Sequence, residues 1–192
     1  MHFKDTEFLE SISQNVETIL SLQSQISEIS RCIELITKTL KKKNKVFICG
    51  NGGSAAQAEH FSTEFLVRLN PKVNRRPYPI VPLSFNTSHL TACANDFHFV
   101  DIFAKTLHAV ATKNDCLIVL STSGKSKNIL KVLKFSKKLR IKSIAFLGYK
   151  SNKLKLADVN LFVNSSDTAR IQEAHLFLGH FILNEVEKKL KK

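Results

Sequence analysis

Short apolar runs that alternate with helical patterns are the feature of this sequence that most restricts its fold. The runs occupy residues 45–49, 80–84, 116–121, 142–147 and 160–163, and helical patterns at 54–67, 88–94, 100–112, 126–139 and 168–190 lie between or after them. Strands with almost no polar residues, separated by helices, are typical of a parallel sheet that is covered on both faces. The sequence therefore predicts an α/β fold, and its 192 residues fit one domain of ordinary size.

The first 43 residues have a different pattern from the rest of the chain. Apolar side chains recur there at spacings near three, four and seven, as at Phe8, Ile12, Val16 and Ile19. This spacing places them on one face of a helix over 5–42, which is longer than a typical globular helix. We therefore expect a break or a helical hairpin in residues 1–43 and a role for this segment in oligomerisation. Residues 44–192 would form the α/β core.

Two turns that follow apolar runs have unusual chemistry. Residues 50–54 read Gly-Asn-Gly-Gly-Ser, and residues 121–126 read Ser-Thr-Ser-Gly-Lys-Ser. Ligands of parallel sheets bind beyond the carboxyl ends of the strands, where such turns lie. Glycines let the backbone approach a ligand closely, and the helix that follows offers free N–H groups and the positive end of its dipole. We expect both turns to meet at one edge of the sheet and to bind a phosphate monoester or sugar hydroxyl groups.

Two better-known phosphate-binding patterns fit these turns less well. The first turn matches the glycine spacing of a dinucleotide fingerprint, but residues 69–76 lack the acidic residue that this fingerprint needs about 20 positions later. The second turn ends in Gly-Lys-Ser at 124–126, like a nucleotide P-loop, but Val119 stands where that pattern needs a glycine. Neither nucleotide class is therefore favoured.

Four side chains in two of the expected helices are possible metal ligands. His60 and Glu64 are four residues apart, so they lie on one face of the helix that begins at the first turn. In the last helix, Gln172 and His180 are eight residues apart. Imidazole and carboxylate are ordinary zinc ligands, and an amide oxygen is a rarer one. Taken alone, His60 and Glu64 would more often be a hydrogen-bonded pair than metal ligands.

The spacing of Gln172 and His180 restricts how the two could share a metal. Residues eight apart are about 12 Å apart along a helix and roughly 80° apart around it. Both side chains must reach toward a midpoint, or one of them must come from a neighbouring chain. We therefore hypothesise that the site lies at an interface between subunits.

The basic character of the chain does not by itself indicate a nucleic-acid partner. The formal net charge is +13, from 29 Lys and Arg against 16 Asp and Glu. The lysines are spread along the chain, with small clusters at the ends of expected helices, where cations complement the helix dipole. No recognised nucleic-acid-binding motif accompanies them. We expect a solvated basic surface that attracts a small anionic substrate.

Cysteine spacing and the N-terminus indicate the compartment. The four cysteines, Cys32, Cys49, Cys93 and Cys116, form no zinc-binding or redox motif and are expected to be buried, reduced thiols. The first ten residues are charged and lack an apolar signal core, and no apolar run reaches the roughly 18 residues of a membrane span. We expect a cytoplasmic protein with no membrane partner.

Four segments in order, "CGNGGSAAQAEHFSTEF", "ANDF", "STSGKSKN" and "DTARIQEAHLFLGH", resemble the phosphoheptose isomerases of the sugar isomerase (SIS) family. The resemblance runs from about residue 45 to the end of the chain. It implies a three-layer α/β/α sandwich around a five-stranded parallel sheet, with a long N-terminal helix, and a homotetramer. It also implies one zinc ion per subunit, bound by His60, Glu64, Gln172 and His180.

The resemblance further implies a reaction and a substrate site. Family members isomerise sedoheptulose 7-phosphate to D-glycero-D-manno-heptose 7-phosphate, which feeds ADP- or GDP-heptose synthesis for lipopolysaccharide or capsule. Moving a proton between C1 and C2 through an enediol needs a base and an acid, for which we expect Glu64 and His180. The expected substrate contacts are Asn51, Gly52, Gly53, Ser54, His60, Glu64, Arg68, Asn95, Asp96, Ser121, Thr122, Ser123, Ser126 and Gln172.

The chain departs from the family pattern in two places, and one relative offers an alternative function. Residues 67–69 read Val-Arg-Leu where the family has Gly-Arg-aromatic, and the loop that follows contains Arg75-Arg76-Pro77. Both changes leave the exact sugar open. For His98, Glu173 and His175 we expect structural or supporting roles. The alternative is a non-catalytic SIS tetramer that binds the replication initiator; it lacks the glutamate of the first helix, so Glu64 favours the enzyme.

Overall fold

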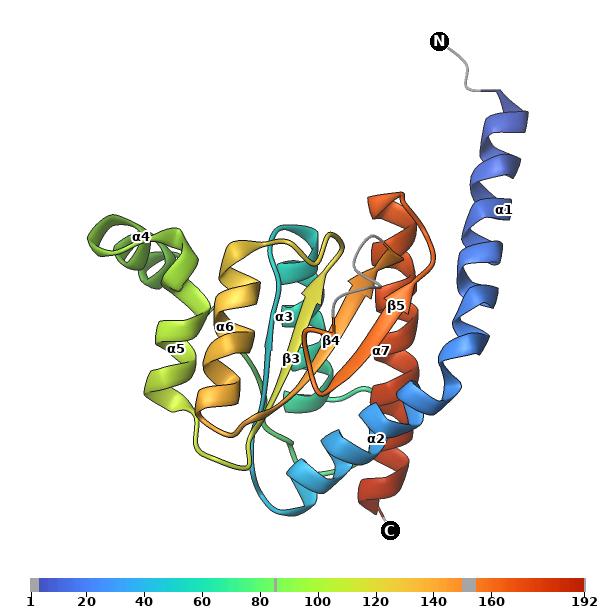
Figure 1. Ribbon diagram of the computed structural model, residues 1–192. Coiled ribbons are helices and arrows are strands. Elements are labelled where there is room, and N and C mark those ends of the chain that lie inside the picture. Colours follow the sequence, from blue (N-terminus) through green and yellow to red (C-terminus); the bar gives the residue numbers. More distant parts are fainter. Residues whose placement is uncertain (1–3, 85, 150–154, 192) are drawn as a thin grey trace.

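The computed structural model describes residues 4–84, 86–149 and 155–191, and it contains a parallel five-stranded sheet (Figure 1). The strand order is β2 (Ile80–Pro82), β1 (Val46–Cys49), β3 (Cys116–Ser121), β4 (Lys142–Gly148) and β5 (Val159–Val163). Every neighbouring pair is parallel. The predicted α/β fold is therefore confirmed, and the ends of the core strands and helices differ from expectation by at most two residues.

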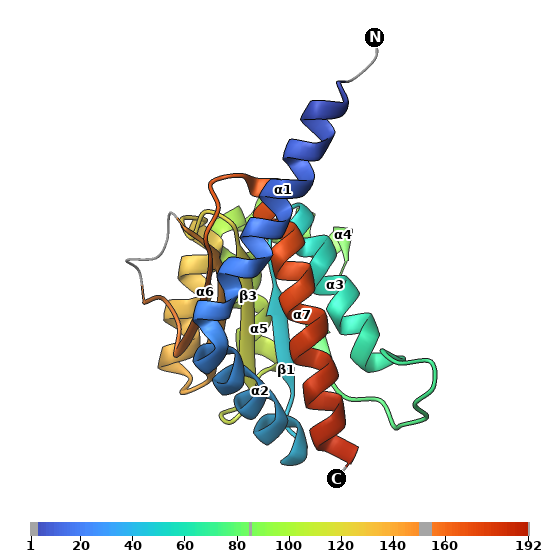
Figure 2. The same cartoon turned by 90° about the vertical axis from the view of Figure 1, so that its right-hand side faces the viewer.

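Helices cover both faces of the sheet and complete a three-layer sandwich. One layer contains α2 (Ile26–Lys41), α3 (Gly53–Leu66) and α7 (Thr168–Lys191), which Figure 2 views from outside. The other contains α5 (Ile102–Val110) and α6 (Lys127–Lys138), with α4 (Thr87–Asp96) and η2 (Phe99–Asp101) at its end. Strand residues alternate between the two cores: Val46 and Ile48 pack on the first layer, and Phe47 and Cys49 on the second. Burial on both faces explains why the strands carry so few polar residues.

The N-terminal helix breaks where it leaves the body of the molecule. Helix α1 (Asp5–Ser21) is followed by a 3-10 turn, η1 (Leu22–Gln25), and then by α2. The Leu22 side chain is buried at the turn, while the hydroxyls of Thr18, Ser21 and Ser24 donate to backbone carbonyls within the same segment. Such side-chain bonds compete with regular helix formation. The expected break therefore lies at residues 22–25.

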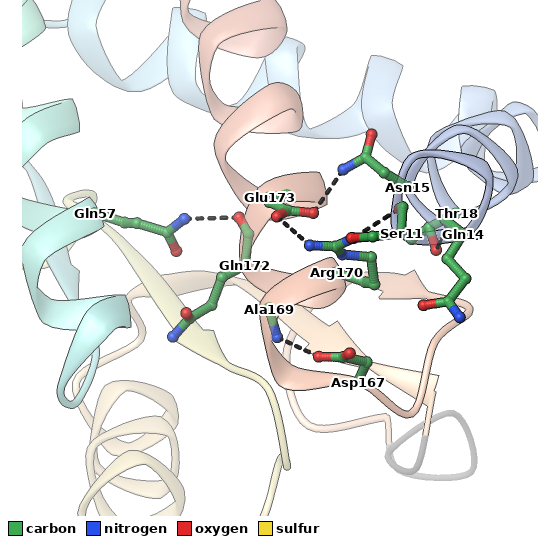
Figure 3. Close-up of polar contacts among 10 residues, drawn as sticks. All are labelled: Ser11, Gln14, Asn15, Thr18, Gln57, Asp167, Ala169, Arg170, Gln172 and Glu173. Atoms are coloured by element: carbon green, nitrogen blue, oxygen red, sulfur yellow. Dashed lines mark hydrogen bonds and ion pairs between the residues drawn. The ribbon is translucent and has the colours of Figure 1, made fainter. Parts of the chain in front are cut away.

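Helix α1 is attached to the first turns of α7 by a polar network (Figure 3). The guanidinium of Arg170 donates to the backbone and hydroxyl oxygens of Ser11, at 2.8 and 2.6 Å, and to Glu173 at 2.6 Å. The second carboxylate oxygen of Glu173 accepts from the Asn15 amide at 2.6 Å. Glu173 thus has the structural role expected for it.

Part of α1 is apolar and exposed. Its side chains Phe8, Leu9, Ile12, Val16 and Leu20 are each 45–62% exposed, and Figure 1 shows the helix projecting beyond the sheet. Contiguous exposed apolar surface of this kind usually marks an interaction site. In the described part of the chain, no helix combines the length and the apolar character needed to cross a bilayer.

Candidate active site

The glycine-rich turn joins β1 to α3 at the carboxyl edge of the sheet. Gly52 has φ +55°, in the left-handed region that favours glycine, and α3 begins at the next residue. A side chain at Gly50 would meet the Ser54 carbonyl oxygen at 2.6 Å. These constraints explain the glycines, because the turn closes tightly on the start of α3: the Ser54 N–H donates to the Asn51 carbonyl oxygen at 3.1 Å and the Ala55 N–H to that of Gly52 at 2.9 Å.

The serine-rich turn follows the neighbouring strand, β3, and lies at the same edge. Its backbone is organised by its own hydroxyls: the Gly124 N–H donates to Ser121 Oγ at 3.1 Å, and the Lys125 N–H donates to Ser123 Oγ at 3.2 Å. Thr122 is half-buried, and Ser126 precedes the first residue of α6. The predicted meeting of the two turns therefore follows from the parallel pairing of β1 and β3.

A pair of side-chain amides connects the two turns. Asn51 Nδ2 donates to Asn128 Oδ1 at 2.9 Å, and Asn128 Nδ2 donates to Asn51 Oδ1 at 2.8 Å. Asn128 is buried on α6 and was not predicted from the sequence, although it stands only two residues beyond the serine-rich turn. The pair fixes the orientation of Asn51, which was an expected substrate contact.

Gln172 lies against the start of α3. A Cβ atom at Gly53 would be 2.6 Å from Gln172 Nε2, so a glycine is needed there for the amide to occupy its place. Gln57 Nε2 donates to the Gln172 carbonyl oxygen at 2.7 Å and fixes the backbone behind it. Figure 3 shows the Gln172 side chain on the opposite side of α7 from Glu173.

We expect Gly53→Ala to displace Gln172 with little loss of stability. The new methyl group would meet only the end of a flexible side chain, which can move away. Thermal unfolding should therefore change little, whereas the KM for a sugar phosphate should rise, because the amide leaves the turn. Ala56→Gly, on an exposed position of the same helix, controls for helix propensity. An unchanged KM in Gly53→Ala would show that the position of Gln172 is unimportant.

Three of the four expected ligands come together between α3 and α7. His60 Nε2 lies 2.7 Å from His180 Nε2 and 3.4 Å from Glu64 Oε1. One ligand-type atom from each residue lies within 4.8 Å of the other two. Gln172 lies instead near Gly53, and His60 is seven residues further along α3, or about 10 Å. The structure thus forms a His60–Glu64–His180 group with Gln172 toward the sheet edge.

Close packing of the two helices explains why this group forms. Gly179, next to His180, has no room for a side chain, because a Cβ atom there would overlap the Phe61 ring. Phe61 is 2% exposed and also meets the His180 ring edge to face, with 5.8 Å between the ring centroids. A glycine on α7 and a phenylalanine on α3 therefore set the separation of the helices beside the histidines.

The chemistry of the group fits a divalent metal such as zinc. Glu64 Oε2 is buried and has no hydrogen-bond partner among the described residues, which is costly unless a ligand satisfies it. The His60 side chain is 43% exposed, so the group is open to solvent on one side. Two imidazole nitrogens and a carboxylate oxygen are a common donor set of catalytic zinc sites, with a further position left for another ligand.

The remaining expected contacts lie further from this group. Arg68 is exposed beyond the end of α3 and is 3.5 Å from the Pro71 carbonyl oxygen. Asn95 and Asp96 end α4, in the other helical layer, where the Asn95 amide donates to the Asp96 carboxylate at 2.9 Å. Ser54 is buried in the first turn of α3. Within one chain, Asn95 and Asp96 are thus separated by the sheet from the helices that carry the histidines.

His175 is buried in the core between α7 and the sheet. Its ring is 0% exposed and meets the Phe146 ring, with 5.8 Å between centroids. Burial lowers the pKa of His175 to about 4, and the nearby Leu147 carbonyl opposes this only in part. His98, in contrast, is exposed before η2.

We expect His175 to make stability depend on pH between about 6.5 and 4. Its pKa is depressed in the folded state, so in this range the unfolded chain binds a proton that the native chain does not. The free energy of unfolding should therefore fall as the pH drops, by up to about 3 kcal/mol from this group. Urea unfolding at pH 7 and pH 4.5 measures the loss. It should shrink in His175→Leu and persist in His98→Asn; an equal loss in all three proteins would exclude His175 as its source.

Comparison with known proteins shows the family to which the chain belongs. Residues 7–148 match the SIS domain family. The chain is 41% identical over 169 residues to a phosphoheptose isomerase of Helicobacter pylori, covering 88% of this chain and 87% of that protein. It is 40% identical over 188 residues to the phosphoheptose isomerase of Aliarcobacter butzleri, covering 96% and 95%.

The fold also matches a solved structure of the same kind. Phosphoheptose isomerase GmhA from Neisseria gonorrhoeae superimposes with a TM-score of 0.86 and 30% identity, over 95% of this chain and 98% of that one. Sequence and fold agree over nearly the whole length of the chain. It therefore belongs to the phosphoheptose isomerases, which are sugar-phosphate isomerase enzymes with a SIS domain.

Proposed function

We propose that this chain isomerises sedoheptulose 7-phosphate to D-glycero-D-manno-heptose 7-phosphate through an enediol. The observation that carries the proposal is the His60–Glu64–His180 group on the two helices that begin at the carboxyl edge of the sheet. This group offers an acid, a base and metal-binding atoms on a side that is open to solvent. The two turns at the start of α3 and α6 are suited to a phosphate and to sugar hydroxyls. The names of the relatives and the order of the sequence motifs support the same substrate class.

Glu64 and His180 would divide the proton transfers between them. The Glu64 carboxylate removes a proton from C1 of the ketose, and His180 donates one to the oxygen on C2, which gives the enediol. A proton then returns to C2 while the C1 hydroxyl gives up its own, which produces the aldose. The Glu64 carboxylate is suited to the first step, because it belongs to the His60–Glu64–His180 group and its side chain is 18% exposed.

His60, Glu64, Gln172 and His180 would hold one zinc ion per subunit. When bound, zinc would polarise the C1 and C2 oxygens and so lower the cost of the charge that develops on them. A metal-bound carboxylate is a weaker base, so Glu64 should bind the metal through one oxygen only. Gln172 would be the fourth ligand. Its amide would either reach from the sheet edge toward the histidines of its own chain or bind the metal of a neighbouring chain.

We propose that a second copy of this chain covers α1, within a homotetramer. Residues 1–43 would then be the oligomerisation segment of a single SIS domain whose core is 44–192. The exposed apolar side chains of α1 support an interface, as do Phe177 and Phe181, which are 48% and 45% exposed beside His180 on α7. Asn95, Asp96 and Gln172, which lie apart from the histidines, could then reach the site of another subunit.

Mixed oligomers test whether sites are shared. Glu64 and His180 belong to one group within a chain, so sharing concerns Gln172 rather than these two. We expect mixtures of Glu64→Gln and Gln172→Ala chains, each nearly inactive alone, to recover part of the activity. Mixtures of Glu64→Gln and His180→Ala should recover none. If the first mixture stays inactive after confirmed subunit exchange, every site is built from one chain.

Turnover of sedoheptulose 7-phosphate is the direct test of the proposed reaction. The purified protein should form the aldose phosphate, and a chelator should abolish this. Turnover that survives complete metal removal would refute zinc but not the isomerase. Absence of turnover, together with binding to the replication initiator, would favour the non-catalytic alternative, which the names of the relatives do not support. The aldose would feed nucleotide-activated heptose for lipopolysaccharide or capsule, as a cytoplasmic step.

A further inference from the structure

A buried ion pair joins the loop after α3 to the far end of α7. Arg75 Nε donates to Glu187 Oε1 at 2.5 Å, and the two side chains are only 5% and 2% exposed. The Arg75 guanidinium also lies over the rings of Phe65 and Tyr78, 5.0 and 5.4 Å from their centroids. Arg75 belongs to the loop that departs from the family pattern, where an exposed arginine would be free to bind a sugar phosphate. Burial removes it from that role.

The same guanidinium holds the end of α3 through its backbone. Arg75 Nη2 donates to the Glu64 carbonyl oxygen at 2.7 Å, and Nη1 donates to the Phe65 carbonyl oxygen at 2.9 Å. The last carbonyls of a helix have no partners within the helix, and a cation at this end is favourable. Arg75 thus contacts the main chain of Glu64 itself, one of the three residues of the group.

Glu187 lies on the same side of α7 as His180. It follows His180 by seven residues, so it lies two turns further along the same side of the helix. The Arg75–Glu187 pair therefore connects the helix that carries His60 and Glu64 to the helix that carries His180. Phe61 and Gly179 set the helix separation at the group, and the ion pair sets it beyond the group.

We propose that Arg75 and Glu187 are positioning residues for the His60–Glu64–His180 group. They fix α3 against α7 and do not touch the ligand atoms themselves. The proposal rests on the proposed metal function of His60, Glu64 and His180. Residues that orient metal ligands commonly change metal affinity by about 10–100-fold when they are replaced. A pair that served only to stabilise the fold would change stability and leave zinc affinity unaltered.

Zinc affinity of conservative variants separates the two roles. Arg75→Lys keeps the charge but cannot bond both carbonyls and Glu187, and Glu187→Gln keeps the shape but removes the ion pair. Competition with a chromogenic chelator, at a temperature where circular dichroism shows the variants folded, should give zinc dissociation constants about 10–100-fold weaker than that of the wild type.

Asp115→Asn is the matched control. Asp115 is also buried and ion-paired, with Lys45 at 3.6 Å, and it accepts from the Lys45 and Thr112 N–H groups just before the start of β1 and β3. The Asp115→Asn substitution should lower the unfolding midpoint. It should change zinc affinity by no more than about 3-fold, which is the size of effect expected between residues that do not interact.

Each outcome has a separate meaning. Wild-type affinity in both Arg75→Lys and Glu187→Gln would overturn the positioning role while leaving the metal site intact. Weakening by Asp115→Asn as large as by the other two would also overturn it, because general destabilisation would then explain the loss. A wild type that binds no zinc would refute the proposed metal site itself. If Arg75→Lys fails to fold, Glu187→Gln carries the test, since it leaves the bonds of Arg75 to α3 in place.

Discussion

Glu64→Gln should lower kcat for sugar-phosphate isomerisation by about 10²–10⁴-fold, the range typical for loss of a general base. The amide has nearly the same shape as the carboxylate but cannot accept the C1 proton. The Glu64 side chain is 18% exposed beside His60, so its carboxylate can meet a substrate at the open side of the group. Steady-state kinetics with sedoheptulose 7-phosphate measure the loss, and substrate binding should be much less affected.

Glu59→Gln provides the matched control for this substitution. Glu59 is exposed on the same helix, and its side chain lies outside the ligand group. The change removes the same charge from α3, so a general electrostatic effect would appear in both variants. A kcat for Glu64→Gln within a few-fold of the Glu59→Gln value would eliminate Glu64 as the base.

Gly179→Ala should damage both stability and turnover. The added methyl group would overlap the buried Phe61 ring, so α3 and α7 must move apart. Overpacking of this kind costs about 1–3 kcal/mol, which exceeds the roughly 1 kcal/mol that alanine gains over glycine in a helix. Because His60 and His180 lie on the two helices, their 2.7 Å contact should open. A displacement of about 1 Å can lower turnover about 10²-fold.

A second substitution tests the reason for this effect. Phe61→Leu leaves space for the methyl group, so the double variant should regain part of the turnover lost in Gly179→Ala. Thermal unfolding and kcat are measured on all three variants. If Gly179→Ala is as stable and active as the wild type, the close helix contact does not control the site.

The sequence predicts the sheet and its two turns because these depend on local patterns. Apolar runs identify each strand, and glycine and serine identify the turns that follow β1 and β3. The i, i+4 spacing also places His60 and Glu64 on one face of α3 without further information. These features need only residues that are close together in the chain.

Contacts between distant residues could not be read from the same patterns. Gly179 and Phe61 are 118 positions apart, and nothing near either residue indicates that they touch. Arg75 and Glu187 look like surface charges in the sequence, yet they form a buried pair. Asn128 looks like an ordinary helix residue, but it holds Asn51. Each depends on how helices pack on the sheet, which follows from the fold as a whole.

Turnover measured against buffered free zinc tests the central claim most directly, with wild type compared with His60→Ala. Metal-free wild type should be inactive, and its activity should rise with zinc and saturate at one ion per chain. His60→Ala should need far more free zinc for the same activity, because it removes one of the two imidazoles of the group. Full turnover by metal-free wild type, or the same zinc dependence in both proteins, would contradict a metal-dependent isomerase site between α3 and α7.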